Sequence, residues 1–93
     1  MITIYKYPLR PSEEAIEIKI PRKKKIISAG LDPLGQVCIW AIVNDETPLE
    51  TVRFYCVGTG WPLEWMLNND SVKFIGTVKQ HHLMWHIFQG VGK

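Results

Sequence analysis

The sequence has few of the residues that usually carry catalysis. Its three serines, Ser12, Ser28 and Ser71, lie outside any nucleophile-elbow pattern. The acidic residues fall in expected loops and on outer strand faces, without the pairing that acid–base catalysis requires. No hydrophobic run approaches the roughly 18–20 residues of a membrane span, and the net charge is only +2. We therefore expect a protein that is not an enzyme, needs no cofactor and has no membrane partner.

Cysteine is also scarce, with only Cys38 and Cys56 in the chain. Both lie within apolar segments that read as strands, where burial raises a thiol pKa and makes the group inert. The first residues do not follow the pattern of a signal peptide. These features predict free, buried thiols in the reducing cytoplasm of a cell, and a disulfide is the less favoured alternative.

Period-two alternation of apolar and polar residues dominates the chain, which predicts β-strands. The 93 residues are expected to form a single domain, 1–93, and their 46% hydrophobic and 22% charged content is ordinary for a folded globule. The only expected helix is short and covers 62–67, with Pro62 in its first turn. The fold class is mainly β (α+β): an antiparallel sheet of six or seven strands arranged as a small sandwich, roll or open barrel. The expected strands cover 2–7, 16–20, 25–31, 37–43, 51–57, 72–79 and 83–88.

Two hairpins are expected, one that joins 25–31 to 37–43 and one that joins 72–79 to 83–88, together with one further pairing. Asp32-Pro33-Leu34-Gly35 has the composition of a type I turn, and 72–79 and 83–88 are joined over Gln80-His81-His82. If the loop 44–50 also joins a hairpin, residues whose numbers sum to about 95 face each other. Trp40 then lies opposite Tyr55 and Ile42 opposite Arg53, while Cys38 and Cys56 point to opposite faces. A slip by one residue would bring the two cysteines together.

The turn Gly58-Thr59-Gly60-Trp61-Pro62 is the favoured place for a ligand. Glycines allow close backbone approach, the threonine adds a hydroxyl, and the tryptophan can stack on a flat ring. The alternative is that the glycines simply form the turn while Trp61 covers the core. The candidate ligand-binding residues are Trp40, Arg53, Tyr55, Gly58, Thr59, Gly60, Trp61 and His86.

Two other groups of residues have a weaker functional interpretation. The basic run Arg22-Lys23-Lys24-Lys25 lies between two strands and can contact phosphates, or it can be a solvated turn that discourages edge pairing. No aromatic residues are interleaved with it, which counts against nucleic acid. His81, His82 and His86 lack a neighbouring carboxylate or cysteine, so no metal site is expected. His86 is expected to be a hydrogen-bonded or ligand-facing side chain.

Several short motifs spread over nearly the full length resemble a family of small bacteriophage and prophage proteins of unknown function. The resemblance rests on Ile4-Tyr5-Lys6-Tyr7-Pro8-Leu9, Ile39-Trp40-Ala41, Arg53-Phe54, Gly58-Thr59-Gly60, Phe74-Ile75-Gly76-Thr77 and Trp85-His86-Ile87-Phe88. The basic run is more charged than is usual in that family. The resemblance implies a phage origin and assigns no chemistry.

A phage origin favours a protein that acts on its host by binding. By functional analogy with phage anti-defence sponges, we expect a homo-oligomeric protein in the host cytoplasm that sequesters a small nucleotide-derived immune signal. Base stacking on tryptophan and tyrosine and phosphate contacts from Arg53 and the glycine turn would serve this role. The alternatives are a module that inhibits a host protein through an aromatic patch or sheet edge, and nucleic-acid binding through the basic run.

Overall fold

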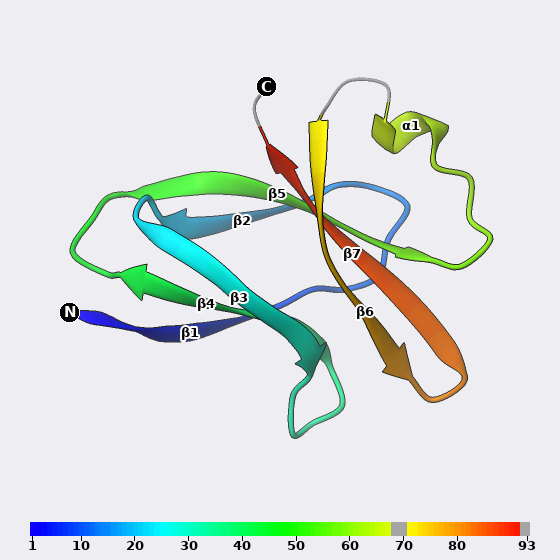
Figure 1. Cartoon of the computed structure of the whole chain (residues 1–93), viewed down its shortest axis with the longest axis horizontal. Helices are drawn as coiled ribbons and strands as arrows, with labels where there is room; N and C mark the ends of the chain where they lie inside the picture. Colours follow the sequence, from blue (N-terminus) through cyan, green and yellow to red (C-terminus); the bar gives the residue numbers. More distant parts are fainter. Residues whose placement is uncertain (68–70, 92–93) are drawn as a thin grey trace.

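The computed structural model describes residues 1–67 and 71–91, and its strands form two antiparallel sheets (Figure 1). In the first sheet the order is β1 (Ile2–Pro8), β4 (Val37–Asn44) and β3 (Lys24–Leu31). In the second it is β2 (Ile16–Pro21), β5 (Leu49–Gly58), β7 (Leu83–Val91) and β6 (Ser71–Gln80). The one helix, α1 (Glu64–Leu67), begins two residues later than expected. The predicted mainly β fold is confirmed as two sheets, which do not close into a barrel over the described residues.

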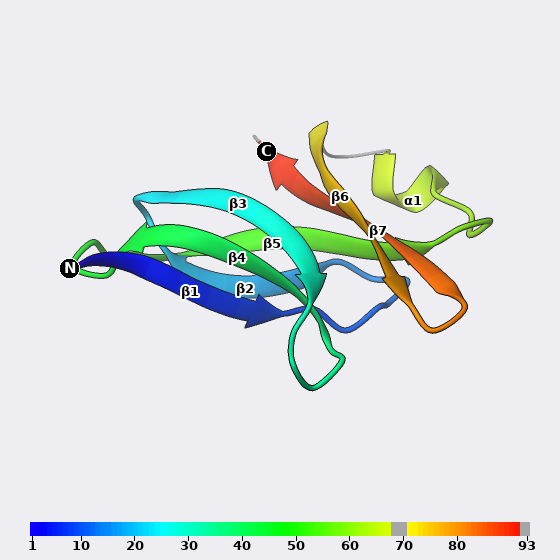
Figure 2. The same ribbon diagram turned by 60° about the horizontal axis from the view of Figure 1, so that its bottom comes forward.

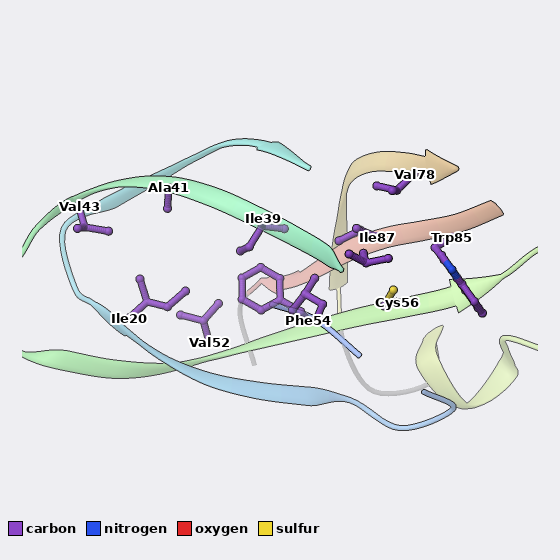
Figure 3. Packing of buried hydrophobic residues seen from close by; sticks show 12 residues of the cluster. Ile20, Ile39, Ala41, Val43, Val52, Phe54, Cys56, Val78, Trp85 and Ile87 are labelled. Carbon is purple, nitrogen blue, oxygen red and sulfur yellow. The ribbon is translucent and has the colours of Figure 1, made fainter. Parts of the chain in front are cut away.

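The hydrophobic core lies between the two sheets (Figure 3). Alternate residues of β4 point toward alternate residues of β5, and Ile20 of β2 closes the space beside them. At the other end of the core, Val78 and Ile87 from β6 and β7 pack near Cys56. The alternation therefore places one face of each sheet in the core, as the pattern predicts. The buried residues of β4 and β5 in this cluster are Val37, Ile39, Ala41, Val43, Val52, Phe54 and Cys56.

The expected pairing of 37–43 with 51–57 is wrong. Trp40 lies opposite Lys6 and Ser28, and Tyr55 lies opposite Phe88. A strand has two edges for hydrogen bonding, and β4 uses one for β1 and the other for β3, so β5 lies across the core in the other sheet. Ile39, Ala41, Val43, Val52, Phe54 and Cys56 still share one core, because two strands can contribute to it by stacking as well as by pairing.

Three turns place the strands. The β3–β4 hairpin closes with the Gly35 amide donating to the Asp32 carbonyl over 2.9 Å, and Gly35 has a φ of 82°. The β6–β7 hairpin turns at His81 and His82, as expected. Between β4 and β5, the Arg22 amide donates to the Pro48 carbonyl over 2.7 Å, which ties this connection to the β2–β3 turn.

Both cysteines are buried and free, in agreement with the prediction. Cys38 is in the three-stranded sheet and Cys56 in the four-stranded sheet. Neither the expected register nor its one-residue slip applies, because the strands that carry the cysteines are not paired. Within residues 1–67 and 71–91, no helix has the length and apolar character needed to cross a membrane.

Candidate functional site

The predicted glycine turn is present at the end of β5. The Trp61 amide donates to the Gly58 carbonyl over 3.2 Å, and Gly60 has a φ of 89°, a left-handed conformation that favours glycine. The turn leads to α1 through Pro62 and Leu63. Figure 2 shows α1 beside β6 and β7, at the end of the molecule away from the N-terminus.

A cavity of about 320 Å³ lies next to this turn, and we call it the Trp61 cavity. It forms because β5 and β7 pair with Gly58 opposite Trp85, which brings the start of β7 beside the turn. The β6–β7 hairpin supplies the remaining side. The cavity is lined by Gly58, Thr59, Trp61, His82, Leu83, Met84 and Trp85.

Two indole rings form the aromatic part of this cavity. Trp61 and Trp85 meet edge to face, with ring centroids 5.6 Å apart and planes at 77°. The Trp85 ring is held by its Nε1, which donates to Gln80 Oε1 over 2.9 Å. A Cβ at Gly58 would lie 2.8 Å from Trp61 Nε1 and 3.2 Å from Trp85 Cζ3. Only glycine therefore leaves room for both rings at this position.

His86 is fixed by two threonine hydroxyls. Its Nε2 lies 2.7 Å from Thr59 Oγ1 and its Nδ1 lies 3.0 Å from Thr77 Oγ1. A neutral imidazole has one donor and one acceptor nitrogen, whereas a hydroxyl can serve in either role. Either tautomer of His86 can therefore be satisfied, and the ring is held at the same orientation on the sheet. Thr59 also lines the Trp61 cavity, so this group borders the cavity.

Three of the predicted ligand residues lie elsewhere. Trp40 is half-buried on the outer face of the three-stranded sheet, and a Cβ at Gly30 would be 3.5 Å from its Cζ3. Tyr55 is buried and packs on Trp65, with ring centroids 5.7 Å apart. Arg53 forms an ion pair with Glu17 over 3.8 Å.

Arg53 is also distant from the glycine turn. It precedes Thr59 by six residues, which corresponds to about 20 Å along an extended strand. A small ligand in the Trp61 cavity does not reach that far. The structure therefore brings together Gly58, Thr59, Gly60, Trp61 and His86 but not Trp40, Arg53 or Tyr55.

The basic run lies at the opposite end of the molecule from the glycine turn (Figures 1 and 2). Lys24 Nζ donates to Glu50 and to the carbonyl of Arg22, and this bond from Lys24 lowers the pKa of the Glu50 carboxyl. Lys23, Lys24 and Lys25 border a separate cavity of about 310 Å³. One of the four cations thus has a structural partner, and the phosphate role of the run remains a prediction that the salt dependence of nucleic-acid binding tests.

Comparison with known protein families matches residues 1–93 to the domain of unknown function DUF7352. The chain belongs to the DUF7352 family. No curated protein and no solved structure matches it. The expected membership of a family of unknown function is confirmed, and the bacteriophage origin remains a prediction.

The histidines of this DUF7352 chain are separated by their hairpin. His81 and His82 are exposed at its tip, whereas His86 is bonded to the two threonines. Residues 1–67 and 71–91 contain no group of three or more histidine, cysteine or acidic side chains that is able to hold a metal ion.

Sequence reasoning missed the contribution of β7 to the cavity. Met84 and Trp85 lie in the segment expected to be a strand, but the pairing of that strand with β5 was not predicted. Thr77 was also missed, although the predicted hairpin of 72–79 with 83–88 places it near His86. The pairing Thr77↔His86 in β6 and β7 is the signal that would have found it.

Proposed function

We propose that this chain is a non-enzymatic binding protein that holds a small nucleotide-like ligand in the Trp61 cavity. The observation that carries the proposal is the position of Trp61 and Trp85 beside Thr59, whose hydroxyl is bonded to His86. A flat base can stack on an indole, and the Thr59 hydroxyl, which His86 holds in place, can contact its polar edge. A volume of about 320 Å³ is at the lower end of the range for small-molecule sites.

In this proposal Lys79 binds the negatively charged phosphate of the ligand. Among the described residues, no lysine or arginine lines the cavity. Lys79 is exposed and lies directly opposite Met84 across the β6–β7 pair, and Met84 lines the cavity. Opposed residues of an antiparallel pair share one face of the sheet, so Lys79 shares the face of Met84, whereas Trp85 points to the opposite, core face. A phosphate at this rim would be closer to Lys79 than to Arg53 or the basic run.

The resemblance to small bacteriophage proteins supports a biological role for such binding. A phage protein that takes up a nucleotide-derived immune signal without converting it would act as an anti-defence sponge in the host cytoplasm. The proposal includes assembly into a homo-oligomer. It requires tight, stoichiometric binding without turnover.

Native mass spectrometry of the protein purified from a bacterial lysate, repeated after denaturation, tests for a bound ligand. Calorimetric titration with a panel of immune nucleotides then measures affinity. Trp61→Leu should raise the dissociation constant about 5- to 160-fold, since stacking of one base on an aromatic ring contributes about 1–3 kcal/mol. Thr59→Val, which keeps the side-chain shape, should also weaken binding.

Trp40→Leu is the matched control, because it removes a half-buried tryptophan from the other sheet. It should leave the affinity unchanged. Equal losses for Trp40→Leu and Trp61→Leu would contradict binding in the Trp61 cavity. Recovery of a chemically altered ligand would contradict a sponge, and no binding to any nucleotide would contradict the proposal as a whole.

A second candidate function is inhibition of a host protein through an exposed aromatic patch. Phe74 on the edge strand β6 is 56% exposed and meets Phe88 with ring centroids 5.5 Å apart. Exposed aromatic residues are frequent in protein–protein interfaces. This function predicts that Phe74→Asp abolishes capture of a host protein, while no nucleotide alters the melting temperature.

A further inference from the structure

β1 forms the free edge of the three-stranded sheet. The strand order is β1-β4-β3, and none of the strands in residues 1–67 and 71–91 lies beyond β1 on the side away from β4 (Figure 1). An edge strand exposes a row of backbone donors and acceptors that can pair with another strand.

The hydrogen bonds at the two ends of β1 show which of its backbone groups point away from β4. The Leu9 amide donates to Val37 over 2.8 Å, and the Asp45 amide donates to Met1 over 3.1 Å. Both pairs continue the β1–β4 register, in which Tyr5 lies opposite Ala41. Hydrogen-bonded pairs alternate in an antiparallel ladder. The odd-numbered residues of β1 therefore bond to β4, whereas the even-numbered residues Ile2, Ile4 and Lys6 point their amides and carbonyls away from it.

The same even-numbered residues carry the side chains of an outer apolar face. Ile4 lies opposite Ile42 and Lys6 opposite Trp40, and the core faces of these strands hold the alternate residues. Ile2 is 69% exposed and Ile4 is 54% exposed, while Trp40 and Ile42 are half-buried.

Few features discourage pairing at this edge. Lys6 is the only charged residue within β1, and its ammonium is 2.9 Å from Asp32 Oδ2. Proline occurs only at the last position, Pro8. Proteins usually protect such edges with central charges, prolines or bulges.

We propose that β1 pairs antiparallel with β1 of a second copy of this chain, so that two three-stranded sheets form one continuous six-stranded sheet. The two-fold axis passes at Ile4. Ile4 then lies opposite the same residue of the second copy, and each Ile2 lies opposite a Lys6. These three pairs use the outward amides and carbonyls and form six hydrogen bonds. The outer apolar faces of the two copies become continuous across the junction.

The outward groups of β1 favour a second copy, because they are arranged symmetrically about Ile4 and the strand is its own complement in hydrogen bonding. The neighbouring charges are partly paired within the chain: Asp45 and Glu46 contact the amino group of Met1, and Lys6 pairs with Asp32. The exposed side chains of Ile2 and Ile4 are covered when the two outer faces join.

The dimer does not depend on the proposed ligand, and the oligomeric state of the full chain tests it directly. Light scattering after size-exclusion chromatography should give about twice the chain mass of 10.7 kDa. Ile4→Pro removes an outward amide that β4 does not use, so the β1–β4 ladder should remain. Loss of one hydrogen bond in each copy should raise the dissociation constant of the dimer about 10- to 100-fold.

A second variant and a control keep the result interpretable. Ile4→Lys places like charges opposite each other on the two-fold axis and should also produce monomers, even if Ile4→Pro fails to fold. Leu34→Lys changes a residue that is 83% exposed at the tip of the β3–β4 hairpin, and it should remain dimeric. A wild-type monomer at every concentration would overturn the proposal. So would dimerisation of both Ile4 variants at the wild-type concentration, which would assign the dimer to another surface.

Cross-linking tests the register. In the proposed pair the two Cα atoms at position 4 are about 5.5 Å apart, within the usual range for a disulfide. Ile4→Cys should oxidise to a covalent dimer, whereas Leu34→Cys should not. Equal cross-linking of the two variants would overturn the register.

Discussion

Lys6 Nζ donates to Asp32 Oδ2 over 2.9 Å and so joins β1 to the β3–β4 hairpin. The Asp32 side chain is buried, and its Oδ1 accepts the amides of Leu34 and Gln36, both over 2.9 Å. One carboxylate thereby organises the hairpin turn and holds it against the edge strand. Charged and backbone donors together explain why an acidic residue is tolerated in this buried position.

Acid should weaken the folded state through this carboxylate. The hydrogen bond from Lys6, followed by that from the Gln36 amide, lowers the pKa of Asp32 from 3.8 to about 2. Because the folded-state pKa is lowered, the contribution to stability is present above about pH 4 and is lost as the pH falls toward about 2. Urea unfolding at a series of pH values in this window should show a decline in the free energy of unfolding.

Asp32→Asn should flatten that part of the pH profile, because it removes the titrating group. Glu13→Gln, at an exposed position in the loop between β1 and β2, is the matched control and should keep the decline. An Asp32→Asn profile that parallels the wild type would show that other carboxylates cause the acid sensitivity.

Gly58→Ala should destabilise the chain by about 1–3 kcal/mol, the usual cost of overpacking. The added Cβ would lie 2.8 Å from Trp61 Nε1, so the indole must move away from Trp85. Thermal unfolding and tryptophan fluorescence measure the two effects. Gly76→Ala is the control, because its Cβ would make an ordinary 3.5 Å contact with Ala29.

Combining Gly58→Ala with Trp61→Phe tests the cause of this loss. A smaller ring at position 61 should relieve the clash, so the double variant should lose less stability than the sum of the two single changes. Additive losses would mean that Gly58 is required for a reason other than contact with Trp61.

Phe54→Ala should lower the free energy of unfolding by about 3–5 kcal/mol. Phe54 has no exposed surface and lies between the sheets, where removal of its ring leaves a cavity (Figure 3). Phe74→Ala removes a ring that is 56% exposed and should cost less than about 1.5 kcal/mol. Chemical denaturation, with an unchanged m-value, measures the free energy of unfolding of both variants. Equal losses of stability in Phe54→Ala and Phe74→Ala would contradict the assignment of Phe54 to the core.

Cys56 should be unreactive toward alkylating reagents in the native state. Burial raises the pKa of its thiol to about 12, so the reactive thiolate is rare at neutral pH. Burial also raises the pKa of Cys38. Mass spectrometry after brief alkylation should find no modified thiol in folded protein and two in urea. Rapid native modification of Cys56 would mean that this part of the core opens readily.

The strands and turns could be predicted because their signals are local. Alternation in 16–20 specified which face of that strand turns inward, the apolar run 37–43 specified a strand with both faces apolar, and Asp32-Pro33-Leu34-Gly35 specified a turn that the structure contains. Strand partners are not local information. The same alternation fits β4 paired with β5 and β4 stacked over β5, and the expected pair was the wrong choice.

In the candidate site, too, the local turn could be predicted, whereas the residues that other strands bring to it could not. Gly58-Thr59-Gly60-Trp61 could be singled out as a turn with an adjacent aromatic ring, because backbone freedom and stacking are properties of these residues themselves. The contribution of Trp85 and Thr77 depends on the pairing of β5, β7 and β6, and so does the distance that separates Arg53 from Thr59.

The sequence by itself determined the mainly β class, most of the strand segments, the buried thiols and the glycine turn, because each depends on periodicity, on apolar character or on the conformational range of one residue. Only the tertiary structure decided that β4 and β5 belong to different sheets, that Trp61 meets Trp85, and that Trp40 lies on another face. The physical reason is that alternation specifies which side of a strand is apolar, whereas backbone hydrogen bonds, which are the same for every residue but proline, join a strand to its partner.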